Sequence, residues 1–362
     1  MNLFLFLAVA ASAPQDAPAA KVEAVPAAIL EAPFPVTEAE IAGHLAFLAD
    51  ERLRGRGPGT EQERVAALYV AAEFRKLGLA PAGEDGSFEQ GVRFFQTLRS
   101  KESSAAEASL VMSLGESRNV LAWLPGTHQT LADEYLLIGA HFDALGILDG
   151  RVHPGADDNA SGTAGLLAIA RAWAAGPFRP RRSILFVGFG AEEAGMFGSG
   201  AYVEKPARPL ENLVAMINLD MIGRGRFLDM RLLEKGKALL EIPPGPGVGV
   251  LGGGTSPELL ALARAACAAD DLPAHAPEDL PPWMRKAVES AVAGRGDHAP
   301  FERRKIPYLF FSTSEHDDYH RATDTLDKVD VGVLRRVAQA AWRTTLAIDA
   351  RDERPRFVDS DR

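Results

Sequence analysis

Cysteine is almost absent from this chain of 362 residues, which contains only Cys267. A single cysteine excludes an internal disulfide and a cysteine-rich metal site. Basic residues are also in the minority, with 39 Lys and Arg against 49 Asp and Glu, and they form no clustered basic patch. This acidic balance argues against nucleic acid and anionic membranes as partners. Any metal site must therefore be built from histidine and carboxylate side chains.

Long apolar runs are lacking as well, apart from a short one at the start of the chain. Residues 1–13 have an apolar core and end in small side chains, as secretory signal peptides do, although no Lys or Arg precedes Lys21. The run is too short to cross a bilayer, so we expect export without stable membrane insertion. Residues 14–35 are rich in Ala and Pro and are predicted to be a flexible tether, and residues 351–362 a charged tail. Residues 36–350 remain as the folded domain.

Four apolar runs stand out because each leads directly into side chains that bind metals or transfer protons. They are residues 135–140 before His141 and Asp143, 183–189 before Glu192 and Glu193, 213–219 before Asp220, and 307–311 before a segment that ends at His320. Continuous runs of Val, Ile, Leu and Phe are typical of strands buried on both faces of an α/β sheet. Ligands bind beyond the carboxyl ends of such strands. We therefore expect these polar side chains to converge on one crevice.

Predicted helices alternate with these strands and join the whole chain into one layered domain. Thr37 and Thr60 each precede an amphipathic segment and are expected to cap a helix. Further helices are predicted at 161–174, from Glu193 onward, at 257–268 and at 331–348, and paired edge strands at 110–112 and 120–124 with a turn between them. This alternation predicts the α/β class, with a three-layer α/β/α sandwich around a mixed, mostly parallel central sheet.

One more polar segment, residues 154–162, enters a helix with the sequence PGADDNASG. Carboxylates are favoured at a helix N-terminus, so one of Asp157 and Asp158 is expected to cap the helix and the other to bind a metal. The segment completes a set of motifs in a fixed order: HFD, PGADDNASG, AEEAGMFGS, NLDM, GDHAPF and YHRATDT. Over residues 38–348 this order resembles the zinc aminopeptidases of the secreted bacterial leucyl-aminopeptidase type. Glutamate carboxypeptidases and glutaminyl cyclases are more distant relatives.

The resemblance implies a metal centre that holds two Zn²⁺ per chain. The implied ligands are Asp158 as a bridge between the two ions, His141 and Asp220 at one ion, and Glu193 and His320 at the other. Glu192 is implied as the general base, and Asp143 as the carboxylate that holds the ring of His141. Two zinc ions, three carboxylates and a bridging hydroxide sum to a neutral cluster, which a crevice of low dielectric can hold.

Several neighbouring residues are expected to support the metal ligands without binding metal, namely Asp157, Asp297, His298 and Tyr319. His316 lies four residues before His320, but the resemblance assigns the metal to His320 and leaves His316 at the surface or beside the site. Some relatives have a tyrosine shortly before the Asp-His pair, where it stabilises the oxyanion, and residues 290–296 contain none. Arg295 and Tyr319 are the alternatives for that role.

The activity implied is that of a di-zinc exopeptidase that hydrolyses the N-terminal residue from peptides, with a metal-bridged hydroxide as nucleophile. Acidic residues can hold an α-ammonium group, whereas a carboxypeptidase needs Arg or Lys for the α-carboxylate. Arg224 and Arg226 follow Asp220 closely and keep the carboxypeptidase alternative open. A glutaminyl cyclase with one zinc is a second alternative. A catalytically silent binding module is a third, and the retention of all five ligands argues against it. Nothing in the sequence sets the oligomeric state.

Overall fold

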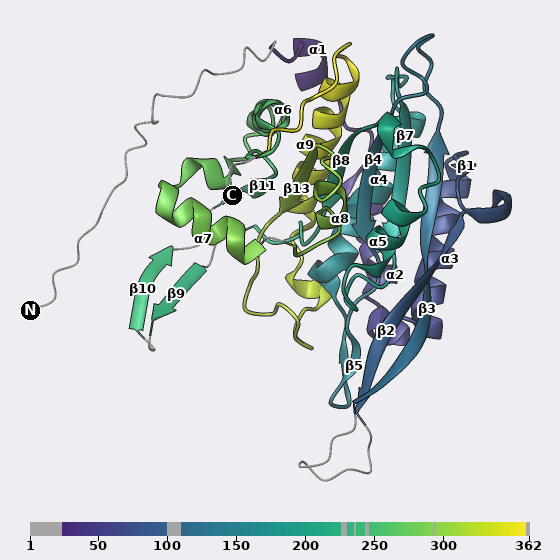
Figure 1. The fold of residues 1–362 in the computed structure, drawn as a ribbon, viewed down its shortest axis with the longest axis vertical. Coiled ribbons are helices and arrows are strands. Elements are labelled where there is room, and N and C mark those ends of the chain that lie inside the picture. Colours follow the sequence, from purple (N-terminus) through teal and green to yellow (C-terminus); the bar gives the residue numbers. More distant parts are fainter. Residues whose placement is uncertain are drawn as a thin grey trace, which may run out of the picture.

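The computed structural model describes residues 24–99, 110–225, 230–234, 237–242, 246–292 and 294–359. A large sheet lies between layers of helices, as Figure 1 shows. The predicted signal peptide and the first part of the predicted tether lie outside the described residues. Every helix within the described ranges is too short or too polar to cross a lipid bilayer.

The main sheet has nine strands in the described part of the chain, in the order β1-β3-β7-β4-β8-β13-β11-β12, with β2 paired to β3. The central strands β7, β4, β8 and β13 run parallel to one another, while β3 and β11 join them antiparallel at either side. The strands are β1 (Ala80–Pro81), β2 (Glu89–Arg99), β3 (Leu110–Leu124), β4 (Tyr135–His141), β7 (Ser183–Phe189), β8 (Leu213–Leu219), β11 (Val248–Leu251), β12 (Ala274–His275) and β13 (Tyr308–Ser312). The predicted mixed sheet is confirmed, and its parallel centre brings four carboxyl ends to one edge.

Helices pack on both faces of this sheet. One face carries α2 (Glu38–Leu48), α3 (Glu61–Lys76), α4 (Gly162–Ala175), α6 (Pro257–Ala268) and α9 (Val331–Asp349), and the other carries α5 (Phe197–Glu204) and α8 (Ala299–Glu302). Smaller elements are α1 (Ala27–Leu30), α7 (Pro282–Val292) and the hairpins β5 (Gly146–Leu148)–β6 (Arg151–His153) and β9 (Met230–Glu234)–β10 (Lys237–Ile242). The predicted three-layer α/β/α sandwich is confirmed.

The apolar runs form strands because both of their faces are covered. In β4, Leu136 and Ile138 pack in the core under α4 and α9, whereas Tyr135 and Leu137 pack in the core under α5 and α8. Successive side chains of a strand point to opposite faces, so a strand between two helical layers must be apolar at every position. All seven residues of β4 are buried.

Both predicted threonine caps are present. The Thr37 hydroxyl accepts a hydrogen bond from the Glu40 amide at 3.3 Å, and the Glu40 carboxylate accepts one from the Thr37 amide at 2.9 Å. Thr60 accepts from the Glu63 amide at 3.2 Å. Each cap satisfies an amide that has no partner within the first turn of its helix.

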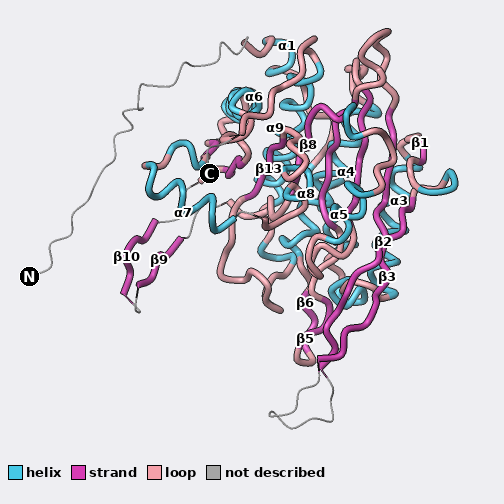
Figure 2. The backbone as a smooth tube through the Cα atoms, in the orientation of Figure 1, coloured by secondary structure: helices cyan, strands magenta, loops and turns pink. Residues whose placement is uncertain are grey.

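The predicted turn between residues 112 and 120 is wrong. Residues 110–124 form one continuous strand, β3, and its partner is β2, with an unbroken antiparallel register from Glu89 opposite Val120 to Arg99 opposite Leu110. The two strands continue side by side to the lower end of the molecule in Figure 2. Gly115 fits within the strand because the ring of Phe94 occupies the space that a Cβ would need.

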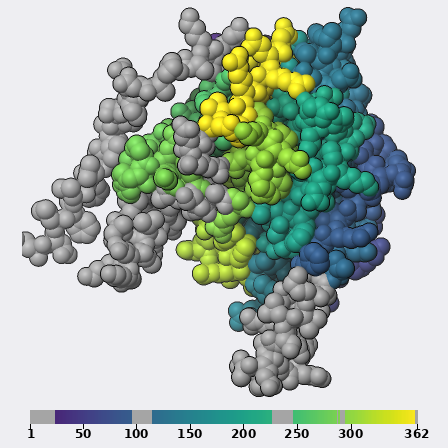
Figure 3. All heavy atoms as spheres, viewed as in Figure 1, coloured from purple at the N-terminus to yellow at the C-terminus, as the bar shows by residue number. Residues whose placement is uncertain are grey.

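Both ends of the domain extend further than predicted. Ile29, Ala32 and Phe34 are buried in the core, so the second half of the predicted tether is packed and not flexible. In the predicted tail, the backbone carbonyls of Arg351 and Asp352 accept hydrogen bonds from Arg182 at 2.6 and 2.9 Å. Figure 3 shows the C-terminal part of the chain, in yellow, beside the teal middle of the chain. Buried apolar side chains in the first segment and hydrogen-bonded backbone carbonyls in the second explain the difference.

Candidate metal centre

The polar residues that follow the four central strands meet at one edge of the sheet, as predicted. His141 is the last residue of β4, Asp220 directly follows β8, and the Glu192–Glu193 pair follows β7. The segment after β13 brings His320 to the same edge, where its ring contacts Asp158 and Glu193. The parallel arrangement of β7, β4, β8 and β13 is the reason, because it aligns their carboxyl ends.

Three of these side chains form a first group around His141. Its Nε2 atom lies 3.4 Å from Asp158 Oδ1 and 3.4 Å from Asp220 Oδ1. The His141 ring is buried, and one donor atom from each residue lies within 4.8 Å of the other two.

A second group shares Asp158 with the first. His320 Nε2 lies 3.3 Å from Asp158 Oδ2 and 3.3 Å from Glu193 Oε2. The two oxygens of Asp158 therefore face different groups, Oδ1 toward His141 and Oδ2 toward His320. A carboxylate in this position can bridge two cations.

Both groups fit zinc. Donor atoms about 2.0–2.1 Å from a tetrahedral zinc lie roughly 3.3 Å apart, which is the spacing found here. Among the described residues, Glu193 Oε1 and Asp220 Oδ1 are buried and make no hydrogen bond. Buried oxygens without a partner are costly unless a cation satisfies them. Imidazole and carboxylate donors in sets of three are also the ligands that catalytic zinc uses.

The electrostatics of the centre show a shortage of positive charge. Burial by itself would lower the pKa of His141, but Asp220 and other carboxylates raise it well above its usual range. Burial would also lower the pKa of His320, but Asp158 and Glu193 outweigh this effect and raise that pKa to about 10. Burial and the negative charge of Asp158 raise the pKa of Glu193 to about 7. Bound dications would supply the missing charge and favour ionised carboxylates beside neutral imidazoles.

Asp143 supports the centre in a different way from the one predicted. Its carboxylate accepts hydrogen bonds from the backbone amides of Glu192 and Glu193, both at 3.1 Å. The closest partner of His141 Nδ1 is the Asp143 backbone carbonyl at 3.2 Å, while the carboxylate lies 3.7 Å away. Asp143 therefore fixes the glutamate pair as well as the histidine ring.

The predicted helix start at Glu193 is wrong, because α5 begins only at Phe197. Residues 192–196 form a turn whose first amides are bound by Asp143. Glu193 contacts His320, and both glutamates line a cavity of about 550 Å³ together with His141 and Asp220.

Asn159 was not singled out from the sequence, although it lies next to the shared aspartate. Its side-chain oxygen accepts from the amides of Gly162 at 2.8 Å and Met221 at 3.1 Å, and its amide nitrogen donates to Leu219 O at 2.9 Å. A Cβ at Gly162 would lie 2.3 Å from the Asn159 side-chain oxygen, so only glycine fits there. Asn159 thereby ties the Asp158 segment to the end of β8.

Arg56 lies under the centre and is completely buried. It donates to the carbonyls of Phe142 and Pro154 at 2.7 Å and of Gly155 at 3.0 Å, and also to Leu48 O. The carbonyls of Phe142, Pro154 and Gly155 belong to the two segments that carry His141 and Asp158, and Leu48 O is at the end of α2. Burial lowers the pKa of Arg56 to about 10, although Asp143 and other carboxylates oppose the shift. Arg56 ends the segment 51–56, which is similar to an ELRGR motif of the family, but that motif does not reveal the backbone partners far along the chain.

The remaining candidates occupy distinct places. Asp297 is buried near His141, and burial raises its pKa to about 7. The His298 ring packs between Tyr308 and Phe310, and burial lowers its pKa to about 3, so it is neutral. Tyr319 stacks on His320 with ring centroids 3.8 Å apart and lines the cavity.

Two candidates lie beside the groups. His316 contacts the carboxylate of Asp157 at 3.1 Å and not a metal group. Arg295 lies at the cavity and is paired with Glu315 at 3.0 Å, with about half of its side chain exposed.

Comparison with known proteins identifies the family of the chain. Residues 119–242 and 253–345, more than half of the chain, match peptidase family M28. Leupeptin-inactivating enzyme 1 of Streptomyces exfoliatus is 27% identical over 346 residues, which cover 88% of this chain and 65% of that protein. The chain spans 14–34% of the lengths of several other curated relatives.

Solved structures show the same fold at lower identity. An aminopeptidase from Aneurinibacillus sp. strain AM-1 has a TM-score of 0.63 at 17% identity, covering 90% of this chain and 95% of that chain. A glutaminyl cyclase from Porphyromonas gingivalis has a TM-score of 0.56 at 20% identity, covering 85% and 97%. The fold, the site and the sequence match lead to one assignment. The chain belongs to peptidase family M28.

Proposed function

We propose that this protein is a di-zinc aminopeptidase that removes the N-terminal residue from peptides. The observation that carries the proposal is the pair of three-residue groups that share Asp158, each with donor spacings suited to one zinc ion. His141 and Asp220 would complete one site, and Glu193 and His320 the other. The leader-like residues 1–13 support export of the enzyme, so that its substrates are peptides outside the cytoplasm.

Zinc bound at these positions would polarise the scissile carbonyl and lower the pKa of the attacking water. The chain itself handles the proton. Glu192 lines the cavity beside both groups, where it would accept a proton from the water and deliver it to the leaving amine. Asp143 holds the Glu192 backbone through the 3.1 Å hydrogen bond and so keeps the carboxylate in reach of the water.

The end of the peptide that the cavity binds can be inferred from whether the nearby arginines already have acidic partners. Arg224, the candidate for binding a substrate α-carboxylate, already donates to Asp324 at 2.9 Å and to Asp318 at 3.3 Å. Arg226 lies outside the described residues. Arg295 is the arginine in the described lining of the cavity, and it is paired with Glu315. The cavity therefore suits an α-ammonium group better than an α-carboxylate.

Acetylating the N-terminus of a peptide substrate tests this polarity. The acetyl group removes the positive charge that Glu192 and Asp220 would hold and adds bulk beside them. We expect kcat/KM to fall by at least about 100-fold, or roughly 2.7 kcal/mol of transition-state stabilisation. Amidation of the C-terminus of the same peptide is the matched control and should change kcat/KM by less than about threefold. Equal turnover of the acetylated peptide, or strict dependence on a free C-terminus, would contradict the proposal.

A glutaminyl-cyclase activity is the second candidate, because a solved cyclase shares this fold. The shared carboxylate argues for two ions, whereas the cyclase alternative predicts one. Zinc counting on the same preparation used for the peptide assays separates them: two equivalents with hydrolysis of free N-termini support the aminopeptidase. One equivalent with cyclisation of N-terminal glutamine would support the cyclase.

Tyr319 is the better candidate for stabilising the oxyanion. Its ring stacks on His320, and burial raises the pKa of Tyr319, so the hydroxyl stays a neutral donor. We expect Tyr319→Phe to lower kcat by about 100-fold with little change in KM, as for loss of one oxyanion donor. Arg295→Met, which breaks a half-exposed ion pair, should lower kcat less than about threefold. Steady-state kinetics of the two variants would reveal a reversed order, which would move the role to Arg295.

A further inference from the structure

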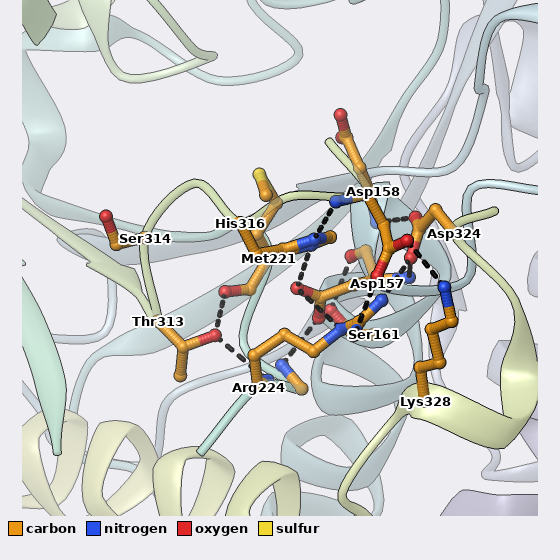
Figure 4. Close-up of polar contacts among 12 residues, drawn as sticks. Asp157, Asp158, Ser161, Met221, Arg224, Thr313, Ser314, His316, Asp324 and Lys328 are labelled. Carbon is orange, nitrogen blue, oxygen red and sulfur yellow. Dashed lines mark hydrogen bonds and ion pairs between the residues drawn. The ribbon is translucent and has the colours of Figure 1, made fainter. Parts of the chain in front are cut away.

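Arg224 is the centre of a polar network beside the metal centre, which Figure 4 shows. Its Nη2 atom donates to Asp324 Oδ1 at 2.9 Å, and Nη1 donates to Asp318 Oδ2 at 3.3 Å. The Nε atom lies 3.9 Å from Asp157 Oδ2. Only 15% of the Arg224 side chain is exposed. One guanidinium is therefore shared among three carboxylates from two segments that are far apart in sequence.

Asp324 carries the effect of Arg224 to the shared aspartate. Its Oδ2 atom accepts hydrogen bonds from the backbone amides of Asp157 and Asp158, both at 3.0 Å. Its backbone carbonyl also accepts from the Ala156 amide at 3.2 Å. Figure 4 shows the Asp324 carboxylate between Arg224 and this backbone. The position of Asp158 therefore depends on a carboxylate that Arg224 holds.

The same arginine fixes the segment that carries His320. Asp318 lies two residues before His320 and Asp324 lies four residues after it, so Arg224 binds that segment on both sides of the histidine. Arg224 itself lies four residues after Asp220, and its amide donates to Thr313 Oγ1 at 3.0 Å. One cation thus links the three segments that carry Asp158, Asp220 and His320.

His316 strengthens the link from the other side. Its Nδ1 atom accepts a hydrogen bond from the Asp318 amide at 3.2 Å, so the ring proton is on Nε2 and is donated to Asp157 Oδ2 at 3.1 Å. Asp157 Oδ1 accepts from the Gly223 amide at 2.7 Å, next to Arg224. The network closes on itself, and none of its side chains belongs to either metal group.

We propose that Arg224 is a positioning residue that sets the geometry and affinity of both metal sites, and not a ligand for the substrate carboxylate. The inference rests on the proposed di-zinc function. A guanidinium is required because it presents donors in several fixed directions, which the single ammonium of lysine does not. Partners that orient metal ligands typically change metal affinity 10–100-fold when they are lost.

The test compares four variants of the full chain by zinc affinity and by the visible spectrum of the Co²⁺-substituted protein. In Arg224→Lys and Arg224→Ala we expect the zinc dissociation constants to rise about 10–100-fold and the Co²⁺ absorption bands to shift. The matched control is Lys328→Met, which removes a partly exposed cation that contacts Asp318 at 2.5 Å. This variant should keep the zinc dissociation constants within about twofold of the wild-type values. Its Co²⁺ absorption bands should not shift.

Asp324→Asn covers the case in which Arg224→Ala does not fold, because it keeps the shape and an acceptor for the backbone amides while weakening the ion pair. It is expected to raise the zinc dissociation constants as Arg224→Lys does. Wild-type affinity and spectrum in Arg224→Lys and Asp324→Asn would overturn the proposal, as would a KM increase in Arg224→Lys confined to substrates with a free C-terminus. A wild-type protein that binds two metals yet cleaves no peptide would overturn the proposed activity and leave this comparison of affinities intact.

Discussion

Replacement of Glu192 by glutamine is expected to lower kcat by about 10²–10⁴-fold while both metal positions stay filled. The substitution keeps the size and shape of the side chain but removes the group that would carry the proton from water to the leaving amine. Burial raises the pKa of Glu192 well above its usual range, and Asp297 and Glu193 add to the shift against the opposing charge of His141. Cations bound at the proposed sites would favour its ionised form, which can accept a proton from water.

Glu193→Gln is the natural control, because it makes the same chemical change one residue along the chain. Glu193 faces His320 and its Oε1 is buried without a hydrogen bond in the described structure, so this variant should lose zinc. The measurements are kcat on a free peptide and zinc per chain by elemental analysis. Swapped phenotypes, with metal lost from Glu192→Gln and retained in Glu193→Gln, would reverse the assignment within the pair.

Asp158→Asn is expected to empty both metal sites, with zinc affinity weakened by more than about 100-fold, since loss of a mere supporting partner already costs 10–100-fold. The reason is the division of its two oxygens between His141 at 3.4 Å and His320 at 3.3 Å. An amide offers one neutral oxygen and an NH₂ group that repels a cation. Activity should fall with the metal, and chelators should reproduce the loss in the wild type.

His320→Ala provides the comparison for a ligand of one group alone. It should lower the zinc content from two equivalents to one, because the His141 and Asp220 group remains intact. Titration of the metal-free variants followed by isothermal calorimetry would resolve the two sites. Full zinc loading of Asp158→Asn, or loss of both ions from His320→Ala, would be incompatible with a bridging aspartate.

The central strands could be predicted because each depends on a local pattern, whereas the set of metal ligands was implied by the family resemblance. The run 183–189 is apolar after Ser183, and it forms β7 with the same bounds. Helix α6 begins at Pro257 and ends at Ala268 as predicted, since its apolar spacing and proline start are local signals. Once the strands are parallel, the polar residues behind them have no other place to lie.

Features that depend on long-range contacts could not be predicted. The segment 115–119 reads as a turn, yet a second strand pairs with it and makes it extended. The amides at Asp157 are bound by Asp324, 167 residues later, and no spacing rule reports such a contact. Asp324 lies within the YHRATDT motif, four residues after His320, and that proximity was the available signal. Glutamate is favoured in the first turn of a helix, which is why a helix was predicted to begin at Glu193. The Asp143 carboxylate instead holds the Glu193 amide in a turn, and α5 begins at Phe197.

The interlocked ends of the domain bear on how the protein is made. The carbonyls of Ala32 and Phe34 are bound by Arg343 and Arg335 of α9, and the Phe34 ring packs against Trp342. These partners are separated by about 300 residues, so the N-terminal segment reaches its site only after α9 has left the ribosome. The start of the domain therefore stays unfastened while the residues between are synthesised, and its pairing with α9 closes the fold.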